Sequence, residues 1–423
     1  KCGTVINMQK PYIVVFAYGK FVLCTNSQML ERHNKRKPMS GRMEDFMKYE
    51  VIYKTSTSFV VELKENGYFS SETEHEIYVN GELAEKSNRN VATVFGLAPA
   101  TTYDVQIKCG DEMTSVFSVT TENEYVVLNV KDFGAKGDGE TNDTAAIQCA
   151  INACPKGGRV YVPAGVYKIY PLFLKSDLVI ELAKDSVLSA YTDRESFPIL
   201  PGRIECQDPE KEYLLGTWEG DPNDMFAAII TGINVENVVI TGQGTIDGNA
   251  SRENWWNNPK VRRIAWRPRM IFLNHCKNVV LHGITVQNSP SWNIHPFFSE
   301  DLKFIGISVL GPKDSPNTDG LDPESCKNVD IIGVYFSVGD DCIAVKSGKI
   351  YMGAKYKTPS EKITIRQCCM RDGHGSITIG SEMAGGVKDM NVEECLFLHT
   401  DRGLRIKTRR GRGKDAIVTG IKF

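Results

Sequence analysis

Hydrophobic and polar residues alternate in short segments over an early part of the chain. Between residues 48 and 121 these segments read "YEVIY", "SFVVEL", "HEIYVNGEL", "VATVFGL", "TYDVQIK" and "SVFSVTT". Alternation with a period of two predicts half-buried strands, and the Asn80-Gly81 step is typical of a hairpin turn. Short strands without intervening helices predict a small antiparallel β-sandwich at residues 43–121.

The pattern of the chain changes after this region. The segment "NDTAAIQCAINAC" (142–154) has helical apolar spacing, with Ile147 and Ile151 on one side. Either Asn142 or Asp143 could cap its first turn. A short helix that covers the start of a long strand array is therefore expected.

A degenerate repeat dominates the rest of the chain. Its segments "ENVVITG", "KNVVLHG", "EDLKFIG", "KNVDIIG", "EKITIRQ" and "KDMNVEE" begin near residues 236, 277, 300, 327, 361 and 388. Short strands at this interval, with turns rich in Gly and Asn, predict stacked rungs with a continuous core. We therefore expect an all-β protein in which a right-handed parallel β-helix at 122–423 follows the sandwich. Longer intervals predict inserted loops around 192–226, 249–268 and 346–360. A doubly wound parallel fold is disfavoured because its helices are missing.

The first 42 residues differ in character from the rest of the chain. They end in the basic run "ERHNKRKPMSGR" (31–42), which is typical of a poorly ordered, solvated arm. The formal net charge of the whole chain is only -2, so nothing suggests a nucleic acid or an anionic membrane as partner. No apolar run approaches the roughly 20 residues that a membrane-spanning helix needs.

The chain contains 12 cysteines, which are scattered rather than grouped in CxxC pairs. Cys276, Cys342, Cys368 and Cys395 lie in apolar runs, where free thiols behave as small hydrophobic groups. This usage favours unpaired cysteines in a reducing compartment such as the cytoplasm. The first residue is a lysine, however, and an upstream segment could have been removed, so secretion stays open as an alternative.

Two adjacent carboxylates interrupt the apolar run "VGDDCIAVKSG" (338–348). Gly339 can bend the backbone there, so that both Asp340 and Asp341 face one surface. Asp319 precedes Asp340 by 21 positions, which is close to one rung. On a β-helix these three carboxylates are therefore expected to converge.

Later turns add an imidazole and two cations to the same line. His374 lies in "DGHGSITIG", and Arg405 and Lys407 lie in "GLRIKTRRG". Arg405 and Lys407 are two residues apart and should share one side of a strand, with Ile406 turned to the core. Hydrolysis of a glycosidic bond needs one protonated and one ionised carboxyl group, and the cations suit a negatively charged sugar such as a uronic acid.

Four short motifs carry a resemblance to a known family. In order they are "NTD" (317–319), "GDD" (339–341), "GHG" (373–375) and "RIK" (405–407), and they resemble the signature motifs of glycoside hydrolase family 28. The similarity extends from about residue 132 to the end of the chain. The resemblance implies hydrolysis of α-1,4-linked galacturonic acid with inversion, without a metal or another cofactor.

The resemblance also implies roles for the motif residues. Asp340 would be the general acid, and Asp319 and Asp341 would hold and activate the water. His374 would sustain the protonation of the acid. The substrate-binding residues would be Asn317, Arg405 and Lys407, with polygalacturonate or an oligogalacturonide as substrate.

A second resemblance covers only the sandwich. The run "LAPATTYDVQIK" (97–108) is similar to the corner of a fibronectin type III domain, with Leu97, Pro99 and Tyr103 at the leucine, proline and corner tyrosine positions. Such a tyrosine is structural. This domain is expected to be a spacer or an accessory to the catalytic part.

Several alternatives for the function stay open. The inserted loops favour exo action, but an endo-polygalacturonase or a rhamnogalacturonan or xylogalacturonan hydrolase is consistent with the same motifs. A calcium-dependent pectate lyase and a non-catalytic carbohydrate-binding β-helix are less favoured, because "GHG" and all three aspartates are present. The final segment "DAIVTGIKF" reads as an unfinished rung, so the catalytic domain is expected to be truncated. Nothing in the sequence indicates an oligomeric state.

Aromatic and imidazole side chains outside the motifs have competing interpretations. Trp255, Trp256 and Trp266 lie in an inserted loop and could either bind sugars or pack the loop. His275, His282 and His295 recur near strand ends, where a structural role is favoured over ligation.

Overall fold

A computed structural model of the chain describes residues 12–17, 20–25, 48–64, 67–208 and 212–423. Near the N-terminus, β1 (Tyr12–Ala17) pairs with β2 (Lys20–Thr25) in an antiparallel hairpin. The other residues of the arm predicted at 1–42 lie outside the described ranges. Among the described helices, none combines the length and the apolar character needed to cross a bilayer.

Two antiparallel sheets form a sandwich ahead of the β-helix. Phe59, Val61, Ile77 and Ile107 fill its core and are almost fully buried. One sheet has the order β3 (Tyr49–Lys54), β4 (Ser58–Leu63), β7 (Val91–Phe95). The other has the order β10 (Phe117–Thr120), β8 (Thr102–Cys109), β5 (Ser70–Val79), β6 (Glu82–Arg89), with β9 (Glu112–Met113) beside β8.

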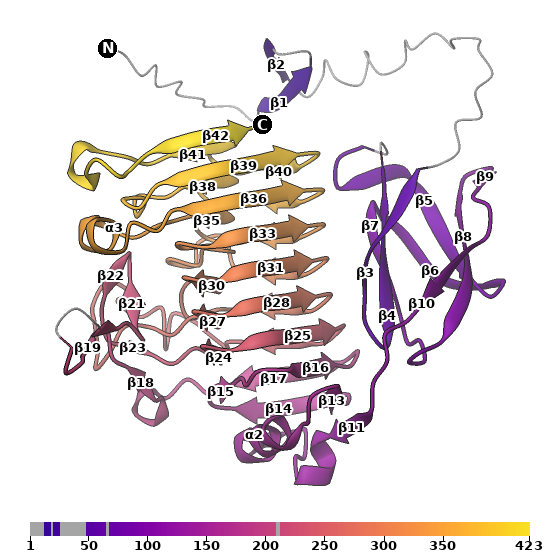
Figure 1. Cartoon of the computed structure of the whole chain (residues 1–423), viewed down its shortest axis with the longest axis horizontal. Coiled ribbons are helices and arrows are strands. Elements are labelled where there is room, and N and C mark those ends of the chain that lie inside the picture. The colour runs from indigo at the N-terminus through magenta and orange to yellow at the C-terminus, as the bar shows by residue number, and fades with distance from the viewer. Residues whose placement is uncertain (1–11, 18–19, 26–47, 65–66, 209–211) are drawn as a thin grey trace.

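A parallel β-helix comes next, as Figure 1 shows, and its strands stack as successive rungs from β11 to β42. This confirms the fold class predicted from the repeat. The longest sheet runs through β11 (Val126–Asn129), β13 (Gly158–Val162), β16 (Leu178–Leu182), β25 (Glu236–Gly242), β28 (Lys277–His282), β31 (Glu300–Ile305), β33 (Lys327–Ile332), β36 (Ser360–Arg366), β39 (Val387–Glu393) and β42 (Val418–Lys422).

The six repeat segments are consecutive strands of this sheet, from β25 to β39. One apolar position of each repeat pairs with the same position of the next, in the series Val238, Val279, Leu302, Val329, Ile363 and Met390. These side chains are buried, and they form part of a continuous core along the rungs. Burial of one face therefore fixes the register of every rung.

Two further faces complete the coil. The second comprises β12 (Asp138–Asn142), β14 (Gly165–Ile169), β17 (Ser186–Ala190), β26 (Thr245–Asp247), β29 (Thr285–Gln287), β32 (Ser308–Leu310), β34 (Tyr335–Ser337), β37 (Cys369–Arg371) and β40 (Leu396–Leu398). The third comprises β15 (Leu172–Phe173), β24 (Ile230–Ile233), β27 (Ile271–Asn274) and β30 (Ile294–Phe297), then β35 (Ile343–Val345), β38 (Ile377–Ile379) and β41 (Leu404–Ile406). Leu321 bridges its two parts, because it pairs with both Ile294 and Ile343.

The predicted helix is present as α2 (Thr144–Ala153), and it covers the first rungs. Ile147 and Ile151 are buried, as the apolar spacing predicted. Of the two candidate caps, Asn142 accepts a hydrogen bond from the N–H of Thr144, at 3.1 Å. The Asp143 side chain accepts hydrogen bonds from two backbone N–H groups in the preceding loop instead.

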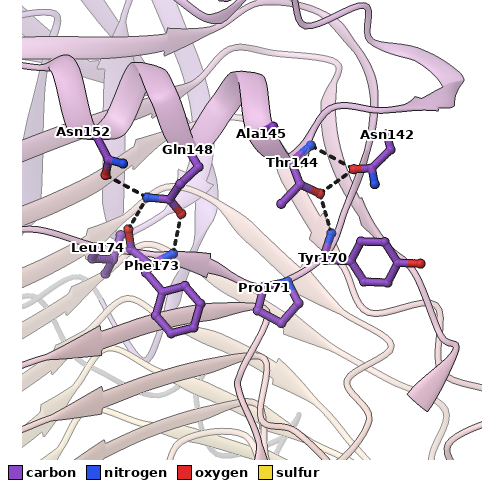
Figure 2. A pocket seen from close by; sticks show the side chains of 9 residues that line it. All are labelled: Asn142, Thr144, Ala145, Gln148, Asn152, Tyr170, Pro171, Phe173 and Leu174. Atoms are coloured by element: carbon purple, nitrogen blue, oxygen red, sulfur yellow. Dashed lines mark hydrogen bonds between the residues drawn. The ribbon is translucent and has the colours of Figure 1, made fainter. Parts of the chain in front are cut away.

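An open pocket of about 660 Å³ lies between α2 and residues 170–174, as Figure 2 shows. Gln148 donates to the carbonyl of Phe173 at 2.9 Å and accepts from its N–H at 2.8 Å. The central amide of the pocket is therefore engaged in attaching the helix to the coil. We assign the pocket no role in chemistry.

The inserted segments carry short elements of their own. Between 199 and 226 these are β18 (Ile199–Leu200), β19 (Ile204–Glu205), β20 (Glu212–Tyr213), β21 (Thr217–Trp218), β22 (Asp221–Pro222) and β23 (Met225–Phe226), and the later insertion holds α3 (Ile350–Tyr356). Glu212 joins the two insertions, because its carboxylate pairs with Lys355 at 2.8 Å and with Arg203 at 2.7 Å. Within the described ranges, short 3-10 turns occur at η2 (Val130–Phe133), η3 (Arg194–Ser196) and η4 (Arg410–Arg412).

The sandwich packs along the side of the β-helix (Figure 1). Val60 and Val91 of the sandwich form a buried apolar cluster with Ile305 and Ile332 of the longest sheet. Beside it, Arg366 donates to both carboxylate oxygens of Glu62, at 2.8 and 2.9 Å. The two units therefore share a partly apolar, partly ionic interface.

The cysteines from Cys109 to Cys395 carry free thiols. Cys276, Cys342 and Cys368 are buried, and Cys395 is half-buried. Burial raises the pKa of the Cys276 thiol to about 11. Such thiols pack as small apolar side chains.

Candidate active site

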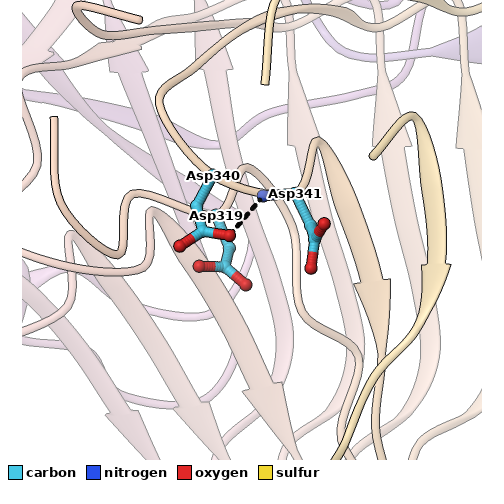
Figure 3. A group of neighbouring side chains, drawn as sticks. All are labelled: Asp319, Asp340 and Asp341. Atoms are coloured by element: carbon cyan, nitrogen blue, oxygen red, sulfur yellow. Dashed lines mark hydrogen bonds between the residues drawn. The ribbon is translucent and has the colours of Figure 1, made fainter. Parts of the chain in front are cut away.

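Asp340 and Asp341 lie in the bend that joins β34 to β35. A Cβ atom on Gly339 would stand 2.2 Å from the carbonyl oxygen of Ser315, so only glycine fits this approach. Asp319 lies one rung earlier, because the N–H of Gly320 donates to the carbonyl of Asp341 at 2.9 Å. The structure thus brings the three aspartates together, as Figure 3 shows.

The three carboxylates each place an oxygen within 4.8 Å of the other two. They differ in exposure: the side chain of Asp340 is 20% exposed, that of Asp319 6% and that of Asp341 2%. The carboxylate of Asp340 also accepts a hydrogen bond from the N–H of Asp341, at 3.0 Å. Asp340 is therefore the aspartate most accessible to a ligand.

His374 reaches Asp340 from the next rung. Its Nδ1 lies 3.2 Å from Oδ1 of Asp340. Its backbone N–H also donates a hydrogen bond to the backbone carbonyl of Asp340, at 3.1 Å. Gly373 permits this contact, because its φ is +82° and a Cβ atom there would stand 2.4 Å from the Asp340 carbonyl oxygen. The side chain of His374 is 53% exposed, so the imidazole is accessible to solvent beside the acid.

Arg405 and Lys407 both reach Asp341. Nζ of Lys407 lies 2.6 Å from Oδ2 of Asp341, and Nη1 of Arg405 lies 3.6 Å from Oδ1. The two cations share one side of the chain, as expected from their spacing. Ile406 between them pairs with the buried core residue Ile379 of the previous rung, and it is 50% exposed because β41 is the end strand of this sheet in the described part of the chain.

Asp319 is the most constrained of the three aspartates. Nζ of Lys346 lies 3.3 Å from its Oδ2, at the end of β35. Burial raises the pKa of Asp319 to about 7, and the charges of Asp340 and Asp341 add to this shift while Lys346 and Lys407 oppose it. The three aspartates therefore have unequal surroundings, which is the condition for separate acid and base roles.

Asn317 of the "NTD" motif has a backbone φ of +55°, in the left-handed region that asparagine tolerates. Its side-chain oxygen accepts a hydrogen bond from Nη2 of Arg267 at 2.6 Å. Arg267 is 3% exposed and also donates to the carbonyls of Pro290 and Pro316. The guanidinium thus fixes both the loop and the orientation of Asn317.

The aspartate cluster has the dimensions of a cation site. The ammonium groups of Lys346 and Lys407 already lie against Asp319 and Asp341, so the chain itself supplies positive charge to these carboxylates. A metal is not needed to offset their repulsion.

Sequence reasoning missed two residues of this region, Arg267 and Lys346. Lys346 stands within the "VGDDCIAVKSG" run itself, directly after a buried strand, and a lysine in that place is a signal for a buried ion pair. Arg267 lies in "AWRPRM", where two arginines interrupt an apolar context. The sequence alone does not identify the residues that Arg267 and Lys346 contact, because those contacts depend on how the rungs stack.

The structure decides between the competing interpretations for Trp255, Trp256, His282 and His295, while Trp266 is half-buried and stacks on Trp218 with ring centroids 4.5 Å apart. Trp255 and Trp256 are 0% and 6% exposed, so they pack the inserted loop rather than present a face to sugars. His295 is buried and its Nε2 lies 2.9 Å from Glu324, while His282 lies between the sandwich and the β-helix. Both histidines have structural surroundings.

Comparison with known proteins gives a consistent result. The model of the glycosyl hydrolases family 28 matches residues 209–423, and that of the rhamnogalacturonase A/epimerase, pectate lyase-like family matches residues 127–179. A probable polygalacturonase of Vitis vinifera is 36% identical over 301 residues, which cover 69% of this chain and 59% of the relative. The chain thus spans less than two thirds of that relative's length.

Two further relatives differ in the activity that their names state. An endo-polygalacturonase of Pectobacterium carotovorum subsp. carotovorum is 31% identical and covers 68% of this chain and 69% of the relative. The crystal structure of an exopolygalacturonase from Thermotoga maritima is also 31% identical, with a TM-score of 0.60 over 68% of this chain and 70% of that one.

Proposed function

Because the chain belongs to glycosyl hydrolases family 28, we propose that it hydrolyses α-1,4-galacturonosyl linkages of pectin. One observation carries this proposal: three aspartates converge within 4.8 Å beside the paired cations Arg405 and Lys407. Carboxyl groups in unequal surroundings suit acid-base hydrolysis, and cations suit a uronic acid.

The exposures of the aspartates support a division of roles. Asp340, the most exposed, is the general acid, and it gives its proton to the glycosidic oxygen as the bond to the anomeric carbon breaks. Asp319 and Asp341 hold the water, whose oxygen bonds to the anomeric carbon while its proton passes to a carboxylate. His374 supports the acid through its 3.2 Å contact with Asp340.

Substrate binding is assigned to Arg405, Lys407 and Asn317. The two cations exchange part of their contact with Asp341 for the carboxylate of a galacturonate unit, because guanidinium and ammonium groups pair strongly with carboxylates. Asn317, held by Arg267, orients a sugar hydroxyl.

We also propose inversion at the anomeric carbon. Inverting enzymes generally keep their carboxyl groups roughly 6.5–9.5 Å apart, whereas the nearest oxygens here lie within 4.8 Å of one another. The resemblance of the four motifs to the family, rather than this spacing, carries the stereochemical proposal.

Exo action is favoured by the inserted loops. Glu212 ties β20 to α3, and Lys349 lies 3.3 Å from Asp221 and 3.8 Å from Glu219 across the same two insertions. Two insertions joined in this way can close one end of a substrate-binding cleft. A closed end suits attack at the terminus of a polysaccharide. Relatives at 31% identity bear both exo and endo names, so the loops carry this part of the proposal.

We infer that the sandwich is a fibronectin type III-like accessory domain. The hydroxyl of Tyr103 accepts a hydrogen bond from the N–H of Ala98 at 2.8 Å, which is the contact of a tyrosine corner. The sandwich packs against Ile305 and Ile332 of the longest sheet, whereas Asp340 and Asp341 lie between strands of the other two faces, and this arrangement suits a spacer role.

Mass spectrometry of the earliest products tests the whole proposal. Polygalacturonate is incubated with the protein and a metal chelator, and hydrolysis is expected to release galacturonate with one added water per bond. Galacturonate monomer at the first time points supports exo action. Oligomers of many lengths at those time points would indicate endo action instead. Unsaturated products, or cleavage abolished by the chelator, would favour a calcium-dependent lyase instead.

A further inference from the structure

A buried group of charges lies beneath the aspartates of the proposed site. We call it the Lys346 cluster, and it consists of Lys346, Asp319, Asp322 and Glu382. Nζ of Lys346 lies 3.3 Å from Asp319, 3.5 Å from Asp322 and 3.7 Å from Glu382. All four side chains are at most 9% exposed. One ammonium group thus serves three carboxylates away from solvent.

An indole ring closes the cluster on another side. Nζ of Lys346 lies 3.5 Å from the centroid of the Trp292 ring, and the guanidinium of Arg269 lies 4.1 Å from the same centroid. Trp292 is 3% exposed and Arg269 is fully buried. The ring attracts the cation and excludes water from it, so Lys346 has few alternative positions.

The charges of the cluster do not balance. With every group ionised, one lysine faces three carboxylates, and both carboxylate oxygens of Asp322 are buried without a hydrogen-bond partner. Burial raises the pKa of Asp322 well above its usual value, and Asp319 adds to the shift. Burial opposes the charge of Lys346, but Asp319, Asp322 and Glu382 raise the pKa of the ammonium group. Lys346 therefore stays charged.

Other charged groups surround the Lys346 cluster. Glu324 pairs in the backbone with Lys346 and contacts His295 through its carboxylate. Arg267 and Arg269 are further buried cations that interact electrostatically with Asp319, and Lys407, Asp340 and Asp341 act on the same carboxylate. Of these groups, only Lys346 has an ion-pair contact with Asp319.

We propose that Lys346 is a positioning residue, which fixes the carboxylate of Asp319 from beneath and opposes the effect of its burial, so that it favours the ionised form that accepts the proton of the hydrolytic water. Glu382 competes for the same ammonium group and moderates this effect. The inference rests on the proposed function for its chemistry. Its geometry is independent of the substrate.

A purely structural lysine would neutralise the core without setting the ionisation of Asp319. The two roles differ in the pH dependence of kcat/KM. The carboxylate that accepts a proton must be ionised, so its pKa sets the limb on which activity rises with pH. Loss of a cation within about 4 Å raises the pKa of a carboxyl group by roughly 1–3 units.

Two substitutions should move that limb in opposite directions. Lys346→Met removes the cation, so the limb should shift to higher pH by about 1 unit or more. Glu382→Gln keeps the shape of the side chain but removes the charge that competes for the ammonium group of Lys346. The limb on which activity rises should therefore shift to lower pH. Lys303→Met, at an exposed position of β31, is the control and should leave the limb in place.

A second readout follows the carboxylate directly. Titration of 13C-labelled aspartates by NMR, with Asp319 assigned through Asp319→Asn, should show the same opposite shifts in protein without substrate. If Lys346→Met does not fold, Glu382→Gln and Lys346→Arg still test the proposal, because arginine should return the limb and the NMR titration towards those of the wild type.

The outcomes separate the two proposals. Shifts of opposite sign support the positioning role, whereas lower activity and lower melting temperature with an unmoved limb and titration would overturn it. A wild-type protein that cleaves no pectic substrate would reject the proposed function. The NMR titration would then still decide whether Lys346 controls Asp319.

Discussion

Nζ of Lys407 lies 2.6 Å from Oδ2 of Asp341, although 66 residues separate them in the sequence. This contact joins the "RIK" motif to the "GDD" motif across the rungs. The side chain of the lysine is 28% exposed and that of the aspartate 2%, so one end of the pair is accessible to solvent and the other is buried. An anionic ligand can therefore reach the cation while the aspartate stays buried.

Replacement of Lys407 by methionine should weaken hydrolysis of polygalacturonate. The change removes a charge-assisted hydrogen bond worth about 1.5–3 kcal/mol, so kcat/KM should fall by roughly 10- to 150-fold. Initial rates over a range of substrate concentrations measure it. Lys422→Met, at an exposed position of β42, is the matched control. Equal rates for the two variants would argue against a substrate contact at Lys407.

Replacement of Asp340 by asparagine should abolish the proton donation. General acid catalysis typically contributes 10²–10⁴-fold, so kcat should fall by about that factor. Binding of an oligogalacturonide, measured by calorimetry, should change little because the shape of the side chain is kept. Asp314→Asn, whose side chain is 75% exposed, serves as the control. Retained activity in Asp340→Asn would refute the acid assignment.

The stereochemical proposal has its own test. Inversion of an α-linkage should release product whose new reducing end is the β-anomer. Proton NMR spectra recorded within the first minutes of the reaction distinguish the anomers before they equilibrate. An initial α-anomer would show retention, and it would reassign one of the aspartates as a nucleophile.

The interface between sandwich and β-helix should depend on Glu62. Its side chain is 1% exposed and binds Arg366 through two hydrogen bonds, with Lys64 2.6 Å away. Glu62→Gln leaves Arg366 without its buried carboxylate partner, which should cost about 3–5 kcal/mol of unfolding free energy. Denaturant unfolding measures it.

Glu50→Gln provides the comparison for this interface. Glu50 contacts the same lysine at 3.1 Å, but its side chain is 60% exposed, so its loss should cost less than about 1 kcal/mol. Similar losses for both variants would show that the buried pair with Arg366 adds no special stability.

Acid should weaken the same interface through His282. The ring is fully buried, and its nitrogens contact Thr93 and Thr241 at 3.1 and 2.8 Å. Burial lowers the pKa of His282 to about 3, from its usual value of 6.5. Because the folded pKa is lowered, this stability is complete above pH 6.5 and is lost progressively as the pH falls towards 3.

A variant separates His282 from the other titrating groups. Between pH 7.5 and pH 5 the wild type should lose about 2 kcal/mol more unfolding free energy than His282→Asn. Thermal and denaturant unfolding at the two pH values give the difference. A parallel decline in wild type and variant would assign the acid sensitivity elsewhere.

Local patterns in the sequence were sufficient for the architecture. Val238, Val279 and Leu302 recur at matching positions of successive repeats, and burial of that face leaves one register for each rung. The same stacking predicted that Asp319 and Asp340 meet, because residues one rung apart lie above one another. For Ile406, periodicity gave the direction of the side chain, which pairs with the core residue Ile379, but it does not determine the exposed fraction, which is 50%.

The sequence by itself thus determined the coil, the sandwich strands and the line of motif residues, because these follow from periods of two residues and of one rung. Only the tertiary structure revealed the contacts of Lys346 with Asp322 and Glu382, of Arg267 with Asn317, and of Glu62 with Arg366, 304 residues apart. Such contacts join different loops, rungs and domains. Their strength depends on burial and distance, which no local pattern encodes.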